Sequence, residues 1–294
     1  MKLQKYKRDS EVSYAMGATL VAELLKTNRA AIRRVFLRPT EKRGEDLEKI
    51  LTELKLHSIE IIETTKAFNI LGAKDNCLLA AEFIKQNRPL TDGNHIILVN
   101  PSDAGNLGTI IRTAVAFGFT NLAIITPAVD PYDPKVVRAS MGALFHLNVM
   151  QYASIEDYQE AHGKRKLYAF MLDENAQKLK ETRPEEPYAL VFGNEAAGLP
   201  KDFAVKTGAQ AVFIPQSEMV DSLNLSIAAG IAMHYFSSLG WDSSSISAPA
   251  STVIYSSTLL SARILFIALS NSVKRIQTES YWTRSPSRAV SFTK

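Results

Sequence analysis

The chain has 294 residues, of which 46% are apolar and 22% are charged. These values are ordinary for a globular protein of about two domains, and they exclude a collagen-like, wholly disordered or disulfide-stapled chain. The single cysteine, Cys77, predicts a reducing compartment such as the cytoplasm. No charge-free apolar run reaches the roughly 20 residues of a membrane span, and no secretory signal is visible.

The net charge of +4 is unevenly distributed along the chain. Residues 1–90 hold 17 Lys and Arg against 12 Asp and Glu, residues 91–240 hold 11 against 16, and residues 241–294 hold 6 against 2. A basic part beside an acidic part is a weak indication of a surface for nucleic acid. The last 54 residues contain no glycine and 14 serines. This shift in composition marks 241–294 as a separate, poorly ordered tail.

The periodicity of residues 1–90 predicts a small α/β unit. In chain order we expect a helix over 12–25, a strand over 33–39, a helix over 46–56, and strands over 58–63 and 77–83. The segment 85–94 is rich in turn-forming residues and reads as a linker.

Residues 95–240 alternate between strand and helix patterns. The expected elements are a strand over 95–100, a helix over 107–117, strands over 122–126, 166–172, 188–194 and 210–215, and a helix over 222–237. This alternation predicts the α/β class, with a parallel sheet covered on both faces. Ligands of such sheets bind at the carboxyl ends of the strands.

Three predicted strands run into polar, turn-forming loops. In the first loop, over 100–114, a helix is expected to begin near Asn106, and its free N–H groups favour an anion. Arg112 lies on the second turn of that helix, where a solvent-facing role is the simpler interpretation. In the third loop, over 214–236, Ser222 is a good N-cap and Asn224 falls in the first helical turn.

The second loop, over 191–200, places Asn194 and Glu195 between Gly193 and Gly198. It lacks the Lys and Ser/Thr of a Walker loop and the spacing of a dinucleotide fingerprint. A nucleotide-like ligand and a purely structural turn therefore both remain open here. Elsewhere there is no C-x-x-C, no histidine pair at metal spacing and no G-x-S-x-G, so no metal site is predicted.

Taken together, in order and spacing, the three loops resemble the three motifs of the SpoU (TrmH-type) branch of the SPOUT RNA methyltransferases. The resemblance covers about 95–240 and rests on Asn106, Gly108 and Arg112; on Gly193, Glu195 and Gly198; and on Ile214, Pro215, Ser222, Leu223 and Asn224, continued by Ser226 and Ala228. Residues 1–90 resemble, more loosely, the substrate-binding domain that precedes the catalytic domain in many members.

The resemblance implies a trefoil knot on the C-terminal side of the catalytic domain, a bound S-adenosylmethionine, and a homodimer whose active site uses both chains. It implies methyl transfer to a ribose 2′-hydroxyl of RNA, with rRNA favoured over tRNA because the two-domain layout is common among rRNA-modifying members. Arg112 is then the candidate for activating the hydroxyl, or only for clamping a phosphate. The other implied reaction-centre residues are Asn106, Glu195, Ser222 and Asn224. Implied cofactor contacts are Gly193, Asn194, Gly198, Ile214, Pro215, Leu223 and Leu225.

Some features depart from the family pattern or leave another interpretation open. Asp221 stands where Glu or Ser is frequent, and 216–219 lacks a glycine often found there. An RNA-binding protein of the same fold that has lost methyl transfer is the main alternative, and a dinucleotide-dependent oxidoreductase is a distant third. Within the tail, 258–269 predicts a short amphipathic helix that docks on the body or on a membrane surface. Alternatively, the tail is an RNA-contacting arm or a segment without a selected role.

Overall fold

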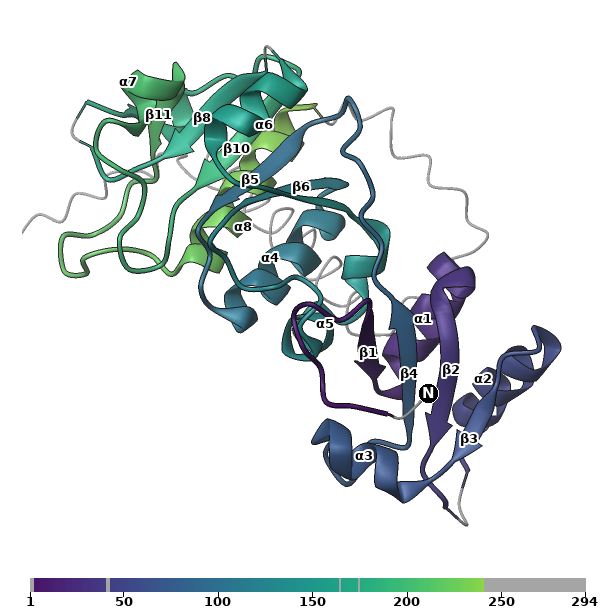
Figure 1. Cartoon of the computed structure of the whole chain (residues 1–294). Coiled ribbons are helices and arrows are strands. Elements are labelled where there is room, and N and C mark those ends of the chain that lie inside the picture. Colours follow the sequence, from purple (N-terminus) through teal and green to yellow (C-terminus); the bar gives the residue numbers. More distant parts are fainter. Residues whose placement is uncertain (1–2, 41–42, 164, 174, 241–294) are drawn as a thin grey trace, which may run out of the picture. The chain divides into compact units, whose positions relative to one another are not determined.

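The computed structural model describes residues 3–40, 43–163, 165–173 and 175–240. The predicted tail, 241–294, and each interpretation of it lie outside the described residues. Within the described ranges the strands form two sheets (Figure 1). The predicted boundary near residue 90 falls between these sheets, and the division of the chain into domains stays a prediction.

The first sheet has four strands in the order β1-β4-β2-β3. β1 and β2 run antiparallel to β4, whereas β3 runs parallel to β2. The strands are β1 (Val12–Met16), β2 (Ile32–Leu37), β3 (Ile61–Glu63) and β4 (Leu79–Ile84). The helices of this part are α1 (Ala18–Asn28), α2 (Glu45–Leu56) and α3 (Thr65–Leu71), with the 3₁₀ turn η1 (Arg29–Ala31) between α1 and β2.

The helix expected over 12–25 is wrong in its first part, because Val12–Met16 is a strand. Val12 and Met16 are four residues apart, a spacing that fits a helix. β1 instead pairs over its whole length with β4, a partner distant in sequence. Gly17, with φ of 124°, then separates the strand from α1. This positive φ is readily adopted only by glycine, so the chain changes direction at this position.

The second sheet has seven strands, all parallel, in the order β7-β6-β5-β10-β8-β11-β9. This confirms the predicted α/β class with a parallel sheet. The strands are β5 (His95–Val99), β6 (Asn121–Ile125), β7 (Asn148–Tyr152), β8 (Lys166–Phe170), β9 (Gln177–Lys178), β10 (Tyr188–Phe192) and β11 (Gln210–Phe213). The trefoil knot stays a prediction.

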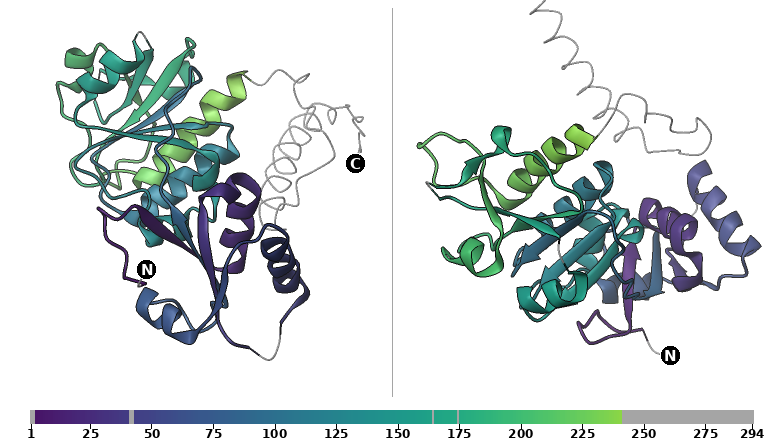
Figure 2. Two further views of the ribbon diagram at one scale, coloured as in Figure 1. Left: turned by 45° about the vertical axis from the view of Figure 1, so that its right-hand side comes forward. Right: turned by 90° about the horizontal axis from the view of Figure 1, so that it is seen from above.

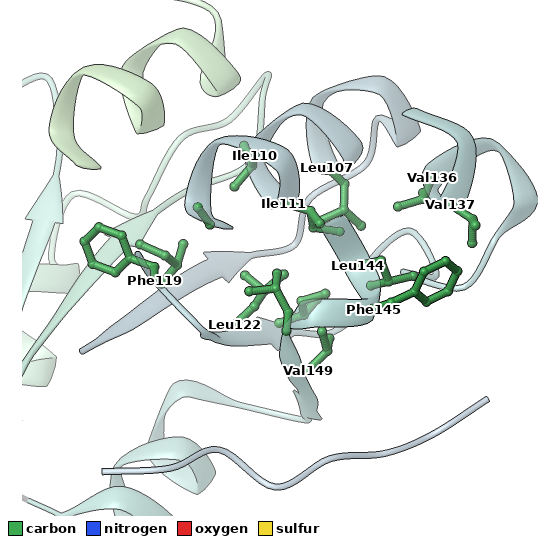
Figure 3. Packing of buried hydrophobic residues seen from close by; sticks show 14 of the residues in the cluster. Leu107, Ile110, Ile111, Phe119, Leu122, Val136, Val137, Leu144, Phe145 and Val149 are labelled. Atoms are coloured by element: carbon green, nitrogen blue, oxygen red, sulfur yellow. The ribbon is translucent and has the colours of Figure 1, made fainter. Parts of the chain in front are cut away.

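Helices cover both faces of the parallel sheet (Figure 2). α4 (Ala104–Ala116), α5 (Pro134–Ala139) and α8 (Leu225–Gly240) share one apolar cluster with alternate residues of the strands. Leu107 and Ile111 of α4 and Leu122 of β6 belong to it (Figure 3). α6 (Ile155–His162) and α7 (Phe203–Thr207) pack on the other face, against the intervening strand residues. The 3₁₀ turns η2 (Ala143–His146) and η3 (Leu179–Glu181) complete the described elements.

The segment 85–94 contains no helix or strand, as predicted for a linker. Its residues are nevertheless held to the parallel sheet and its loops by hydrogen bonds. The Arg88 guanidinium donates to the Phe145 carbonyl at 3.0 Å, and the Thr91 N–H donates to Asn121 Oδ1 at 2.9 Å. The linker is therefore an ordered connection between the two sheets.

Gly108 fixes the distance between α4 and α5. A Cβ added there would lie 2.3 Å from the Cβ of Ala139 and 3.0 Å from backbone atoms of Ala139 and Ser140. The two helices therefore approach as closely as their backbones allow, and α4 cannot rotate away from the sheet without losing this contact.

We expect Gly108→Ala to lower the free energy of unfolding by about 1–3 kcal/mol, because overpacking outweighs the better helix propensity of alanine. Gly230→Ala in α8 is the matched control, since its Cβ would lie 3.7 Å from the Thr113 methyl group, an ordinary contact. Urea unfolding of both variants measures the difference. Equal stability of the two variants would contradict the close packing of α4 on α5.

Candidate active site

The direction in which the sheet is built reverses between β5 and β10, the place where folds of this kind bind ligands. β6 and β7 follow β5 in the chain and lie on one side of it in the sheet. β8 and β10 come later in the chain and lie on the other side of β5. The helix that follows β5 covers one face of the sheet, and the helix that follows β10 covers the other. Loops that diverge in this way leave a crevice at the carboxyl edge of a sheet, the usual ligand site of such folds.

The carboxylate of Glu195, in the loop after β10, lies at the N-terminus of α4. Its Oε2 accepts the Ser102 N–H at 2.9 Å and the Ser102 hydroxyl at 2.8 Å. Its Oε1 accepts the Asp103 N–H at 3.1 Å and the Asn106 side-chain amide at 3.4 Å. The backbone directly before α4 thus holds an anion, which is a side chain of the protein itself, whereas the anionic ligand expected for the first loop stays a prediction.

Two opposing effects act on the pKa of Glu195. Partial burial raises the pKa, while the hydrogen bonds from the backbone and hydroxyl of Ser102 and from the Asp103 N–H lower it. The hydrogen bonds prevail, so the pKa lies below its ordinary value. The group is therefore a carboxylate at neutral pH, and it acts as an acceptor rather than as a proton donor.

The loop after β10 is closed by its own hydrogen bonds. Asn194 and Gly198 pair through their backbones at 2.9 and 3.3 Å, and Asn194 Oδ1 accepts the N–H groups of residues 196 and 197. A Cβ at Gly193 would lie 2.2 Å from the carbonyl carbon of Gly198, so only glycine fits there. Gly198 itself has a φ of 66°. These contacts fix the direction in which Glu195 leaves the strand.

The third loop joins the same network through Asn224. Its Nδ2 donates to Asn106 Oδ1 at 3.1 Å, and its Oδ1 accepts the N–H and the hydroxyl of Ser226 at 2.9 and 2.7 Å. Asn224 therefore caps α8, which begins at Leu225. The predictions that the helix begins at 222 and that Ser222 is its N-cap are wrong, because α8 begins at Leu225 and the Asn224 side chain accepts the Ser226 N–H in its first turn. Ser222 is exposed, with no hydrogen bond among the described residues.

Arg112 is outside this network. It lies six residues beyond Asn106 on α4, about 9 Å along the helix axis. The side chain is half-buried and makes no hydrogen bond or ion pair with the described residues.

The residues predicted to contact a cofactor fall into two groups. Ile214 and Leu223 are half-buried and Pro215 is exposed, whereas the Leu225 side chain belongs to the core. Gly193, Asn194 and Gly198 form the closed loop described above. The roles of all the predicted site residues stay predictions.

Three residues of the site were missed by the sequence analysis: Asn100, Ser102 and Asp103. The Asn100 carbonyl accepts the Asn194 side-chain amide at 2.8 Å, which ties the first loop to the second. Asp103 caps α4 by accepting the Asn106 N–H at 2.7 Å. The pair Ser-Asp before a helix is a recognisable N-cap signal that could have identified two of them.

The three predicted loops therefore meet in one network of carboxylate, amide and hydroxyl groups at the carboxyl edge of the sheet. Such a set of fixed acceptors and donors can orient a ligand hydroxyl. In the described part of the chain, no group of three or more His, Cys, Asp or Glu side chains is arranged to hold a metal ion. Among the same residues, no helix has the length and apolar character needed to cross a membrane.

We expect Glu195→Gln to lower the free energy of unfolding at pH 7 by about 1–2 kcal/mol, because an amide loses the charge-assisted hydrogen bonds. The pKa of Glu195 is lowered in the folded chain, so its contribution is present above about pH 4.5 and is lost as pH falls through the folded pKa. The two stability curves should converge in acid. Glu160→Gln on α6, which removes an exposed carboxylate without hydrogen bonds, should show no such difference. Parallel curves from pH 3 to 7 would contradict this role.

Comparison with known proteins identifies relatives of this chain. Residues 93–234 match the model of the SpoU rRNA Methylase family. The 23S rRNA (guanosine(2553)-2′-O)-methyltransferase RlmP of Bacillus subtilis is 27% identical, over 74% of this chain and 86% of its own length. An uncharacterized tRNA/rRNA methyltransferase of Archaeoglobus fulgidus is 34% identical over 53% of this chain and 69% of its own length. A similar protein of Synechocystis is 35% identical over 47% of this chain, which spans only 51% of that relative.

The fold has a solved counterpart. The AdoMet-bound rRNA methyltransferase from Sinorhizobium meliloti superposes with a TM-score of 0.65 at 25% identity, covering 76% of this chain and 86% of that protein. The match includes more of the chain than residues 93–234, so the likeness extends beyond the family model. The chain belongs to the SpoU rRNA methylase family.

Proposed function

We propose that this protein transfers a methyl group from S-adenosylmethionine to a ribose 2′-hydroxyl of RNA. The network that joins Glu195, Asn106 and Asn224 carries the proposal, because it brings three separate family motifs to one crevice. RlmP, which matches 74% of this chain, is named as an enzyme of this reaction class. Because RlmP is named as acting on 23S rRNA, the similarity supports rRNA as the proposed substrate. The +5 charge of residues 1–90 supports a role in holding the RNA.

The loops at this edge of the sheet fit S-adenosylmethionine, which has a neutral adenine base and a polar tail. Leu223 is half-buried, and its backbone groups bond to no other described residue, so they are available to a ligand. The loop after β10 offers only small side chains, at 196–198, toward solvent. S-adenosylmethionine would supply a methyl group already activated by its sulfonium. The residues that would hold it are Gly193, Asn194, Gly198, Ile214, Pro215, Leu223 and Leu225.

Within this mechanism the protein has to orient the ribose hydroxyl and stabilise the charge that develops on its oxygen. Asn106 and Asn224 are held in place by each other and by Glu195, so their amides are fixed before substrate binds. Ser222, two residues before Asn224 in the chain, is exposed. Arg112, which has no partner among the described residues, supplies the positive charge, either at the hydroxyl or at the adjoining phosphate.

We expect Arg112→Ala to reduce methyl transfer at least about a hundredfold, because a fixed positive charge at the reacting oxygen is lost. The dissociation constant for S-adenosylmethionine should stay unchanged. Transfer of labelled methyl groups to total RNA measures the first, and calorimetry measures the second. Arg138→Ala on α5 is the control, since Arg138 is exposed, its side chain forms no hydrogen bond or ion pair with the described residues, and it is not part of the site.

Retained turnover in Arg112→Ala would contradict the assignment of this residue. The alternative function, an RNA-binding protein that has lost methyl transfer, predicts no transfer by the native chain and no need to bind S-adenosylmethionine.

Mapping 2′-O-methyl positions in total RNA with and without the gene distinguishes rRNA from tRNA as the substrate. In either case the cytoplasm, where a single free cysteine stays reduced, is the proposed compartment.

We also propose that the enzyme is a homodimer. Ile227 and Ile231, one turn apart on α8, are 54% and 39% exposed. α8 packs directly on α4, where the methyl group of Thr113 lies beside Gly230. Exposed apolar side chains on neighbouring turns are typical of a protein interface. A second chain on this surface would approach Arg112 of the first, so that the active site uses both chains.

We expect the native chain to have twice the mass of a 32.5 kDa monomer in solution. Ile231→Asp should convert it to a monomer at micromolar concentration, because a buried, unpaired carboxylate is costly. Light scattering coupled to gel filtration measures the mass. Val205→Asp is the control, since Val205 is 86% exposed on α7, on the opposite face of the sheet. A native chain that runs as a monomer would overturn the dimer.

A further inference from the structure

A cavity of about 390 Å³ lies apart from the network of Glu195, Asn106 and Asn224. Its walls come from the segment before β1, from the end of β4 and the linker, from the loop after β6, and from β7. The side chains used below are Arg8, Glu11, Ile84, Asn87, Tyr132 and Gln151. The volume falls within the range of about 300–1,000 Å³ that is usual for small-ligand sites.

In one wall of the cavity the charges of Asp130 and Lys85 are paired with each other. Asp130, only 9% exposed, accepts the Tyr6 hydroxyl, the Tyr132 N–H at 2.8 Å and the Lys85 ammonium at 3.4 Å. Lys85 also donates to the Arg8 carbonyl at 2.8 Å. The buried ion pair therefore serves to hold the segment before β1 against the loop after β6. The Lys85 charge is therefore paired, and the Arg8 guanidinium donates to the Ala128 carbonyl at 2.9 Å.

Three other polar side chains of the cavity have no such partners. Glu11, Asn87 and Gln151 are exposed, and their side chains form no hydrogen bond or ion pair with the described residues. Ile84, an apolar side chain that is 48% exposed, lies in the same wall. A flat, apolar-faced ligand with a polar edge matches this combination better than a phosphate or a free sugar.

The loop after β6 lines the cavity through Asp130 and Tyr132, and it is also bonded to the first loop of the candidate active site. Val129 donates its N–H to the Pro101 carbonyl at 2.8 Å, and the Asn100 amide donates to the Pro127 carbonyl at 3.1 Å. Ser102, the next residue of that loop, holds Glu195. An RNA strand bound at the catalytic loops can therefore extend along this loop toward the cavity.

We propose that the cavity binds an unpaired guanine base of the substrate RNA. Among the four bases, guanine alone presents two adjacent N–H donors on its Watson–Crick edge, and these match the acceptor-only carboxylate of Glu11. The guanine O6 acceptor beside them matches amide donors of Asn87 or Gln151. Ile84 and Tyr132 pack against the ring. The inference rests on the proposed function, because it requires RNA at the catalytic loops.

Fluorescence anisotropy with labelled RNA hexamers tests the assignment on the full chain without cofactor. The probes are six uridines, the same hexamer with guanine at the third position, and the same hexamer with adenine there. We expect the guanine hexamer to bind about tenfold more tightly than the other two, the effect of one good bidentate contact. Glu11→Gln should reduce this preference below about twofold, and Gln151→Ala should weaken it.

Glu156→Gln, which removes an exposed carboxylate on α6, is the matched control and should keep the native preference. Unchanged thermal unfolding of Glu11→Gln confirms that the variant is folded. Equal binding of the three hexamers by the native chain, or an undiminished guanine preference in Glu11→Gln, would overturn the proposal. A chain that prefers guanine but transfers no methyl group would support the cavity assignment and contradict the proposed function, so the two failures are distinguishable.

Discussion

The carboxylate of Glu195 at the N-terminus of α4 is the contact on which the rest of the site depends. It accepts the backbone N–H groups of Ser102 and Asp103, directly before α4, and it draws the loop after β10 onto the loop after β5. Asn106 is oriented by that carboxylate and in turn orients Asn224. One anion thus fixes three loops, and its lowered pKa keeps it charged at neutral pH.

This contact works only because the backbones around it approach closely. At Gly108 and at Gly193 a single added carbon would overlap neighbouring backbone, at 3.0 Å and 2.2 Å respectively. Both glycines are buried, one on the helix that provides the N–H groups and one at the start of the loop that provides the carboxylate. The glycines of the two motifs are therefore explained by packing, without any contact to a ligand.

The parallel sheet could be predicted because its central strands are buried on both faces and contain apolar runs, as at 96–99 and 122–125. β7, which is partly exposed, and β9, of two residues, carry no such signal. The strand at Val12–Met16 was misread because its partner is distant in sequence. Asn106, Glu195 and Asn224 were found by their motifs. The cavity was not predictable, because its walls come from segments that only the tertiary fold brings together.

The strand order also has a consequence for the time at which the site forms during synthesis. β10 lies in the sheet between β5 and β8, and the partner of Ser102, Glu195, is 93 residues further along the chain. At about 5–20 residues per second, translation needs roughly 5–19 seconds to supply that partner. Throughout this interval the edge of β5, a run of apolar residues, lacks the strand that later covers it. The nascent chain in which this edge of β5 is uncovered therefore already contains the first catalytic loop but lacks the second and third.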